Sequence, residues 1–245
     1  MKVLLLCAGY ATRLYPLTID KPKPLLPVAG KPVIEYTLDI IERVKEVDEV
    51  FIVTNQKFAS HFEEWSKSFS YSKKIVVVND GTVSNDDRLG ATGDIEFVIK
   101  NKSIKDDLLI LAGDNIFKSD LKGFMDFSIS KSPHITIGLF DVKKIILAKK
   151  YGIVKLDDTK KIAEFKEKPK KPDSTLAAQC LYFFPKEKLA IVKQYLNTDS
   201  SKDAPGYFLE WLSKNDQVFG YVFKDVKWFD IGDMASYEKA NSEFS

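Results

Sequence analysis

The feature of this chain that most constrains its fold is a regular alternation of short apolar runs with amphipathic segments. The apolar runs are Val3–Cys7, Val50–Thr54, Ile75–Asn79 and Leu108–Ala112, and the amphipathic segments are Val33–Val44, Phe58–Phe69 and Gly90–Ile99. Short runs of aliphatic and β-branched residues are typical of strands that are buried on both faces. Their alternation with helical segments predicts a parallel sheet with right-handed crossovers.

Beyond about residue 130 the pattern changes to closely spaced strand candidates, which is typical of a mixed sheet. These candidates are Ile135–Phe140, Gly152–Leu156, Ile162–Lys166 and Leu176–Phe184. Helical patterns return at Lys186–Leu196, Gly206–Leu212 and Met234–Ala240. The sequence shows no internal repeat and no hexapeptide periodicity, so we expect no β-helix.

Composition and charge exclude several classes of protein. The 245 residues, of which 44% are hydrophobic and 29% charged, suffice for one α/β domain with a sizeable core. The 37 basic and 35 acidic residues nearly balance, so we expect neither nucleic acid nor a membrane as partner. The N-terminal apolar run is too short for a signal peptide, and no segment reaches the roughly 20 apolar residues of a membrane span. A cytoplasmic protein is expected.

The few cysteines and histidines argue against a disulfide framework and against a zinc site. Cys7 and Cys180 are far apart and each lies in an apolar run, which predicts two reduced core residues. The histidines are His61 and His134, and they add too few ligands for a zinc site.

The first apolar run leads directly into a loop of small residues. This stretch reads Ala8-Gly9-Tyr10-Ala11-Thr12-Arg13-Leu14, and Lys23 follows in a proline-rich segment. Small side chains allow backbone N–H groups to approach a polyphosphate, and Arg13 and Lys23 supply positive charge. Such turns also occur in many α/β domains without this role. The G-x-G-x-x-G and G-x-x-x-x-G-K-[ST] signatures are both missing, which argues against two familiar nucleotide-binding loops.

Two aspartates are candidate ligands for Mg²⁺. Asp114 follows the apolar run that ends at Ala112, and Asp230 follows another apolar run near the C-terminus. Mg²⁺ usually takes one or two carboxylates together with phosphate oxygens and water, which this pair would provide. The alternative for Asp114 is an Asx-turn or a helix N-cap, because Asp and Asn are frequent in both.

Two weaker motifs complete the set. Tyr151-Gly152 precedes the segment Glu164–Pro169, which contains Glu167-Lys168-Pro169, and a lysine in such a run is more often part of a solvated surface. Arg88–Asp94 contains a Leu-Gly turn, preceded by the acidic insert Asp80–Asp87. Each motif is of moderate specificity, but their order along the chain is distinctive.

In that order, over roughly residues 1–240, the motifs resemble those of the sugar-1-phosphate nucleotidyltransferases, also called nucleoside-diphosphate-sugar pyrophosphorylases. The resemblance implies a Rossmann-like three-layer α/β fold with a mainly parallel mixed sheet. It further implies a single domain over residues 1–245, with a nucleotide-binding half at 1–130 and a sugar-phosphate-binding half at 131–245. The loop departs from the family pattern at Ala11, where a second glycine is common.

The resemblance also implies roles for individual residues. Arg13 and Lys23 would act in catalysis, Arg13 on the β- and γ-phosphates and Lys23 on the α-phosphate, with Mg²⁺ on Asp114 and Asp230. The nucleotide-binding residues would be Ala8, Gly9, Tyr10, Ala11, Thr12, Asn79 and Gly90. The sugar-phosphate-binding residues would be Tyr151, Gly152, Glu167 and Lys168.

The function implied is transfer of a nucleoside monophosphate from a nucleoside triphosphate, dTTP or UTP in the first instance, to a sugar 1-phosphate with release of pyrophosphate. Two alternatives within the same fold are a cytidylyltransferase acting on phosphocholine, an inositol phosphate or a phosphonate, and a non-catalytic nucleotide-sugar-binding regulatory module. An NAD-dependent dehydrogenase would need the missing glycine signature. The expected partners are the two substrates, and a homo-oligomer is compatible with the sequence.

Overall fold

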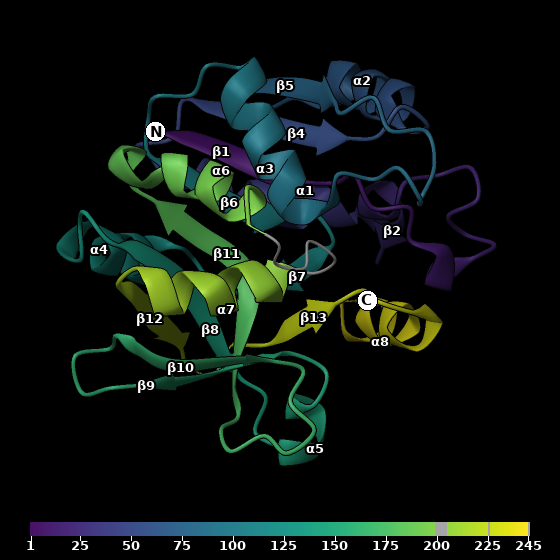
Figure 1. The fold of residues 1–245 in the computed structure, drawn as a ribbon. Coiled ribbons are helices and arrows are strands. Elements are labelled where there is room, and N and C mark those ends of the chain that lie inside the picture. The colour runs from purple at the N-terminus through teal and green to yellow at the C-terminus, as the bar shows by residue number, and fades with distance from the viewer. Residues whose placement is uncertain (199–204, 225, 245) are drawn as a thin grey trace. The chain divides into compact units, whose positions relative to one another are not determined.

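The computed structural model describes residues 1–198, 205–224 and 226–244 as two compact units (Figure 1). The first unit comprises Met1–Leu89, Leu111–Leu121 and Lys227–Ser245, and the second comprises Gly90–Ile110 and Lys122–Val226. Each unit therefore combines segments that are distant in the sequence. The division into functional halves near residue 130 stays a prediction.

The first unit contains the predicted parallel sheet. Its strands are β1 (Lys2–Leu6), β4 (Glu49–Thr54) and β5 (Lys74–Asn79), and β4 pairs in parallel with both of the others. The centre of β1, Val3 to Leu5, is fully buried. The crossovers are α1 (Val33–Glu42), which buries Ile34, Leu38 and Ile41, and α2 (Ala59–Ser68), which packs against β5. Helical periodicity and continuous strand burial thus account for this half-sheet.

Strand β6 (Leu108–Ala112) leads into the first unit at its C-terminal end. The backbone N–H of Gly113 donates to the carbonyl of Leu6 at 3.1 Å. A Cβ at Gly113 would collide with the sulfur of Cys7, so a larger residue would force the two chain segments apart. Glycine at 113 therefore permits the backbone before Asp114 to approach the end of β1 closely.

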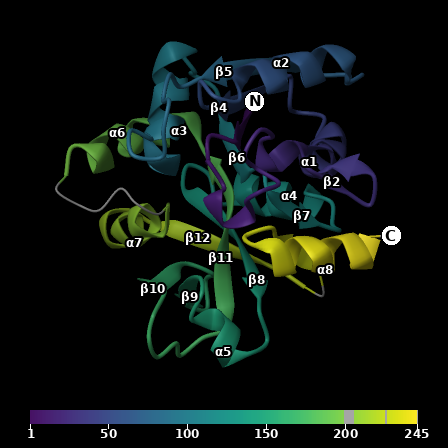
Figure 2. The same ribbon diagram turned by 90° about the vertical axis from the view of Figure 1, so that its right-hand side faces the viewer.

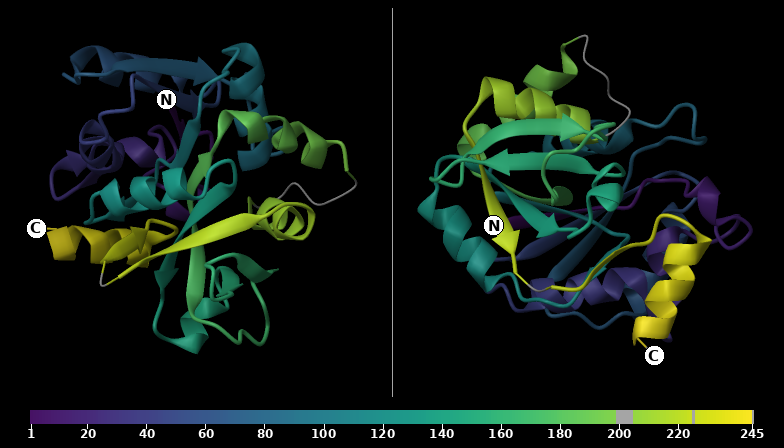
Figure 3. Two further views of the ribbon diagram at one scale, coloured as in Figure 1. Left: turned by 90° about the vertical axis from the view of Figure 1, so that its left-hand side faces the viewer. Right: turned by 90° about the horizontal axis from the view of Figure 1, so that it is seen from below.

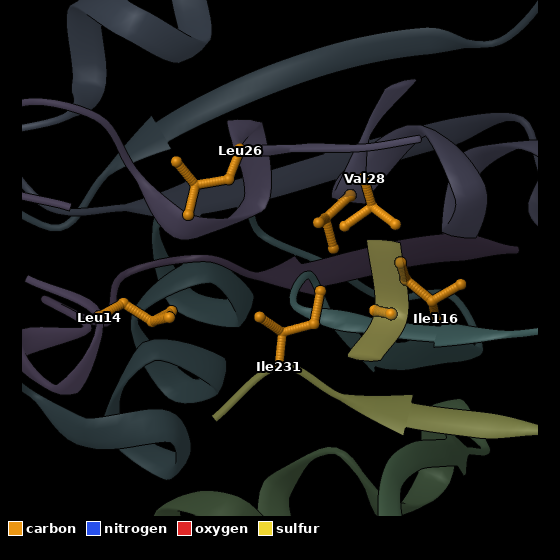
Figure 4. Packing of buried hydrophobic residues seen from close by; sticks show 7 residues of the cluster. Leu14, Leu26, Val28, Ile116 and Ile231 are labelled. Carbon is orange, nitrogen blue, oxygen red and sulfur yellow. The ribbon is translucent and has the colours of Figure 1, made fainter. Parts of the chain in front are cut away.

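The first unit contains a buried hydrophobic cluster (Figure 4). It comprises Leu14, Leu26, Val28, Val33, Ile116, Ile231 and Ala240. The predicted site residues Arg13, Lys23, Asp114 and Asp230 each lie within three positions of a cluster member along the chain. Burial of the cluster stabilises the unit and brings four distant segments together.

The C-terminal segment belongs to the first unit and contains a short strand followed by a helix (Figure 2). Strand β13 (Trp228–Asp230) pairs antiparallel with β7 (Asn115–Phe117), so that Asp230 lies opposite Asn115. Helix α8 (Met234–Phe244) follows and packs against the hairpin of β2 (Pro27–Val28) and β3 (Lys31–Pro32), where Tyr237 donates to the carbonyl of Pro27 at 2.6 Å. None of these four strands was expected from the sequence, because two or three residues carry no periodicity.

The second unit contains the mixed sheet that the closely spaced strands predict. Its strands are β8 (Ile135–Asp141), β9 (Gly152–Leu156), β10 (Ile162–Glu167), β11 (Leu176–Phe184) and β12 (Val218–Phe223). β8 pairs in parallel with β12 and antiparallel with β11, and β9 pairs antiparallel with β11 and β10. The two opposed arrows of β9 and β10 are visible from below in Figure 3. Strand β12 was not expected.

Helices cover the sheet of the second unit. They are α3 (Gly90–Asn101), α4 (Lys122–Ser130), α5 (Ile145–Ala148), α6 (Ala190–Leu196) and α7 (Pro205–Asn215). The helix expected from Lys186 begins instead as a 3₁₀ turn at Lys186–Lys188, and α4 and α5 were not expected. Over the described residues, no helix combines the length and apolar character needed to cross a bilayer. Among the described residues, Cys7 and Cys180 form no disulfide; Cys7 is buried, as predicted, whereas Cys180 is only partly buried.

Candidate nucleotide and sugar-phosphate sites

The first unit contains a cavity of about 370 Å³ at the carboxyl end of β1. It is lined by Leu6, Cys7, Gly9, Tyr10, Ala11, Thr12, Arg13, Lys23, Pro24, Asn85, Arg88 and Asp114. Seven residues predicted to act on the nucleotide or the metal are therefore in one place: Gly9, Tyr10, Ala11, Thr12, Arg13, Lys23 and Asp114. The carboxyl ends of strands are where open α/β sheets bind ligands.

The loop after β1 is held in an unusual backbone conformation. Ala11 has φ 49° and ψ 41°, in the left-handed region. Its carbonyl accepts a 2.8 Å hydrogen bond from the buried hydroxyl of Thr18 and a 3.0 Å bond from the N–H of Leu14. This conformation costs a residue with a Cβ about 1 kcal/mol, so the surrounding contacts must impose it. A Cβ at Gly9 would meet nothing within 4 Å, which leaves that side of the loop open to a ligand.

Lys23 links two other segments to the cavity. Its ammonium forms an ion pair with Asp114 and donates to the carbonyl of Ile231 at 2.7 Å. The ammonium is largely buried, with 15% of the side chain exposed. The local positive charge is therefore fixed in place by a carboxylate and a carbonyl dipole.

Asp230 lies in the same electrostatic environment. Burial and the negative charge of Asp114 raise the pKa of Asp230 from its usual 3.8 to about 6, although Lys23 and Arg13 act in the opposite direction. The carboxylates of Asp114 and Asp230 repel each other, and the ammonium of Lys23 offsets only part of their charge. Such a site favours an additional cation.

The donor set of this site fits Mg²⁺. Within residues 1–198, 205–224 and 226–244, no group of three or more histidine, cysteine, aspartate or glutamate residues could hold a metal. Asp114 and Asp230 would offer two hard oxygen donors, and Mg²⁺ is commonly bound by one or two carboxylates with substrate phosphate and water. Two carboxylates from the protein are therefore enough for Mg²⁺, because its other ligands usually come from the substrate and from water.

Two residues predicted to bind nucleotide have other contacts. The carbonyl of Ala8 accepts a 2.9 Å hydrogen bond from Asn55. The amide of Asn79 donates to Gln56 at 2.7 Å, and its oxygen accepts from the N–H of Gly81 at 2.9 Å. Both residues thus hold the backbone around the cavity, and neither is among the described residues that line it.

Sequence analysis gave no ligand-binding role to five lining residues, and Asn85 and Arg88 are the two of them with strongly polar side chains. Asn85 lies in the acidic insert Asp80–Asp87, whose role was left open, and Arg88 follows directly after it. The sequence did contain one signal, because arginine is rare in this chain and Arg88 precedes the Leu-Gly turn. Gly90, predicted from that turn, begins α3 in the second unit with φ 74°, a conformation that glycine adopts at little cost.

The residues predicted to bind the sugar phosphate lie together in the second unit. Gly152 and Glu167 are paired across β9 and β10, and the N–H of Lys168 donates to the carbonyl of Tyr151 at 3.2 Å. The side chain of Lys168 is 61% exposed, and its ammonium is 3.7 Å from the carboxylate of Glu167. Lys168 also has φ 43°, so the chain turns in the left-handed conformation directly after β10.

The carboxylate of Glu167 is buried between β10 and α7. Only 7% of its side chain is exposed, and this burial raises its pKa. The negative charge of Glu210 also raises the pKa, whereas the positive charge of Lys168 lowers it. A Cβ at Gly206 would overlap this carboxylate, and a Cβ at Gly152 would come within 2.9 Å of it. Two glycines therefore make room for a buried acceptor, and neither Gly206 nor Glu210 was anticipated.

The family of nucleotidyl transferases matches residues 2–245, nearly the whole chain. The chain belongs to the nucleotidyl transferase family. This confirms the family resemblance on which the predicted roles depend. The predicted roles of individual residues remain to be tested.

Relatives of this nucleotidyl transferase carry several different names. The bifunctional protein GlmU of Methanocaldococcus jannaschii is 29% identical over 95% of the chain and 51% of its own length. A glucose-1-phosphate adenylyltransferase of Fusobacterium nucleatum is 29% identical over 98% of the chain and 65% of its own length. The chain thus spans half to two thirds of the length of these two relatives.

A solved structure of an apo UDP-glucose pyrophosphorylase superposes with a TM-score of 0.81 over 99% of the chain and 97% of its own, at 20% identity. This similarity confirms the predicted α/β fold with a mainly parallel mixed sheet.

Proposed function

We propose that this nucleotidyl transferase moves a nucleoside monophosphate from a nucleoside triphosphate to a sugar 1-phosphate and releases pyrophosphate. The observation that carries the proposal is the juxtaposition of Lys23 with Asp114 in a small-residue loop cavity, together with Asp230, whose pKa is raised to about 6 by burial and by the charge of Asp114. Such a site suits a polyanion accompanied by a divalent cation.

The reaction is an in-line displacement at phosphorus. A phosphate oxygen of the sugar 1-phosphate attacks the α-phosphorus, a P–O bond forms, and the bond to the β-phosphate oxygen breaks with its electron pair leaving on pyrophosphate. No general base is needed, because the second pKa of a phosphate monoester is near 6 and the dianion is present at neutral pH.

The main barrier is repulsion between two polyanions, which positive groups reduce. Arg13 binds the β- and γ-phosphates, and Lys23 binds the α-phosphate and the charge that develops on it. In the second unit, Lys168 binds the phosphate of the acceptor, and Glu167 accepts a hydrogen bond from a sugar hydroxyl. The backbone of Gly152 and Tyr151 lies against the sugar.

Asp114 and Asp230 would hold Mg²⁺, which when bound supplies positive charge at the phosphates and orients them. The carboxylates must be ionised for this, so the raised pKa of Asp230 would weaken the affinity of the site for Mg²⁺ as pH falls toward 6. Asp114→Asn should remove turnover and leave the fold intact. Gly9, Tyr10, Ala11 and Thr12, which line the cavity, would form the backbone cradle of the nucleotide. Ala8, Asn79 and Gly90 are further nucleotide-binding residues proposed from the sequence.

The proposed nucleotides are dTTP and UTP and the proposed acceptor is a hexose 1-phosphate. This part of the proposal rests on the segment Gly113-Asp114-Asn115-Ile116-Phe117, which resembles the corresponding segment of thymidylyl- and uridylyltransferases acting on glucose 1-phosphate. A cytoplasmic location and a homo-oligomer stay predictions from the sequence.

The test is pyrophosphate release with Mg²⁺ for each common nucleoside triphosphate, crossed with sugar 1-phosphates, phosphocholine and inositol phosphate. We expect release that requires both substrates, with a pyrimidine nucleotide and a hexose 1-phosphate. Release only with CTP and a non-sugar phosphate would instead support a cytidylyltransferase. No release in any combination, with nucleotide sugars still bound, would contradict the proposal in favour of a regulatory module.

A further inference from the structure

The acidic insert contributes to the cavity of the first unit in a way that the proposed function does not use. Asn85 and Arg88 line the cavity together with Arg13, Lys23 and Asp114. Both side chains belong to exposed residues, so their presence there does not result from burial in the core.

The choice of arginine is unusual for this chain. Only three of its 37 basic residues are arginines, Arg13, Arg43 and Arg88, and the rest are lysines. Two of these three line the same cavity. A guanidinium differs from an ammonium in presenting a planar fork of donors that matches phosphate oxygens. Two of the three positions where this chain uses arginine in place of lysine therefore lie at one candidate anion site.

The insert is ordered by its own carboxylates and hydroxyls. Asp87 accepts hydrogen bonds from the N–H groups of Val83 at 3.0 Å and Ser84 at 2.7 Å, and Asp80 accepts from the N–H of Thr82 at 2.7 Å. The acidic residues of the insert thus satisfy its backbone, as in Asx-type turns. Their negative charge is engaged locally and does not define a metal site.

One of these turns positions Arg88. Its Nη1 donates to the side-chain oxygen of Asn85 at 2.7 Å and approaches the carbonyl of Asn85 at 3.4 Å. An arginine that Asn85 holds in this way loses less rotamer freedom when it binds an anion.

The charges in the cavity point to the anion. Among the described residues that line this cavity of about 370 Å³, three are basic, Arg13, Lys23 and Arg88, and one is acidic, Asp114. An excess of basic over acidic groups in one cavity favours a ligand of negative charge. A triphosphate provides that charge.

We propose that Arg88 binds the triphosphate of the nucleotide substrate and that Asn85 is its positioning residue. The proposal rests on the proposed function for the identity of the ligand. It assigns the insert a role in nucleotide affinity, distinct from any contact with the acceptor.

Arg88→Gln is the direct test, with Arg43→Gln as the matched control because Arg43 is exposed at the end of α1. We expect the KM for the nucleoside triphosphate to rise about 10- to 100-fold, the loss typical of one or two charge-assisted hydrogen bonds. The KM for sugar 1-phosphate should stay within about twofold, and Arg88→Lys should lie between wild type and Arg88→Gln. Arg43→Gln should leave both constants unchanged.

Calorimetric titration with the triphosphate, the monophosphate and the nucleoside of the same base identifies the contacted group and does not require turnover. Weakened binding of the triphosphate alone supports the proposal. Equal weakening of all three would overturn it in favour of a base or ribose contact, and unchanged binding would overturn it altogether. If wild type binds triphosphate without transfer, the proposed function fails while this titration still decides the role of Arg88.

The positioning role is tested by Asn85→Ala in two backgrounds. In wild type it should raise the triphosphate dissociation constant about three- to tenfold, because Arg88 loses its 2.7 Å acceptor. In the Arg88→Gln background the same change should have no further effect. An undiminished effect in that background would overturn the assignment of Asn85.

Discussion

The ammonium of Lys23 donates a 2.7 Å hydrogen bond to the carbonyl of Ile231, 208 positions further along the chain. Lys23 also pairs with Asp114, and Ile231 immediately follows Asp230. One side chain therefore connects the N-terminal loop, the segment after β6 and the C-terminal strand. The three motifs are close in space because a single cation satisfies groups from two of them.

Lys23→Ala should abolish measurable turnover while the protein remains folded. The loss in kcat should be about 10²- to 10³-fold or more, as for removal of one group that stabilises transition-state charge. Removal of the ammonium should also raise the pKa of Asp230 further, because the positive charge of Lys23 lowers it. Steady-state kinetics and circular dichroism check the two parts.

Lys21→Ala is the control for this change, since Lys21 lies two positions away in the same proline-rich segment and is exposed. It should retain wild-type kcat. Normal kcat in Lys23→Ala would exclude Lys23 from the reaction, and equal losses in both variants would indicate a general effect on the loop.

Ala11→Gly should stabilise the protein and weaken nucleotide binding. With φ at 49°, Ala11 pays a steric cost that glycine avoids, so the free energy of unfolding should rise by about 1 kcal/mol. The freer loop should bind triphosphate a few-fold more weakly, because more conformational entropy is lost on binding. Urea denaturation and calorimetry measure the two effects.

Ala29→Gly is matched to it, because Ala29 has φ 48° in the exposed turn between β2 and β3. It should show the gain in stability with unchanged nucleotide affinity. A stable Ala11→Gly variant with unchanged affinity would mean that restriction of this loop does not contribute to binding.

The parts of the fold that the sequence predicted are those with strong periodicity. β1, β4 and β5 are runs of aliphatic and β-branched residues, and such runs have few alternatives to a buried strand. The loop from Gly9 to Arg13 and the carboxylate of Asp114 follow from strand ends, so their meeting in one cavity was predictable.

Other features depend on contacts that leave no local pattern. β7 and β13 are three residues each and form only because each provides the partner of the other. Gly206 reads as an ordinary residue near a helix start, and its importance lies in the buried carboxylate of Glu167. In the sequence Arg88 has the pattern of a solvated residue, and only the fold shows that it lines the same cavity as Arg13. Tertiary contact decides all three cases.

Gly206→Ala should weaken acceptor binding and destabilise the protein. The added Cβ would overlap the carboxylate of Glu167 and displace it, which should cost roughly 1 to 3 kcal/mol of unfolding free energy. The KM for sugar 1-phosphate should rise, and that for the triphosphate should not. The double variant with Glu167→Ala should recover stability without recovering acceptor affinity. Failure of the double variant to recover stability would show that the carboxylate is not what Gly206 accommodates.

Asp230→Asn should stabilise the metal-free protein at neutral pH and abolish its response to Mg²⁺. The folded state raises the pKa of Asp230 from 3.8 to about 6, so it binds this proton more tightly than the unfolded chain does. The stabilising contribution is therefore present below pH 4 and is lost as pH rises through 6. An asparagine keeps the shape and has no proton to lose.

The free energies of unfolding of wild type and Asp230→Asn should accordingly agree near pH 4 and differ by roughly 1 to 3 kcal/mol in favour of the variant above pH 7. Mg²⁺ at pH 7.5 should raise the melting temperature of wild type and leave that of the variant unchanged, because a ligand that binds only the folded state stabilises it. Asp233→Asn is the control for the Mg²⁺ response alone, since Asp233 caps α8 through the N–H of Ser236 at 2.8 Å and its charge also raises the pKa of Asp230. A pH-independent difference between wild type and Asp230→Asn would contradict the raised pKa, and an equal Mg²⁺ response would exclude Asp230 as a ligand.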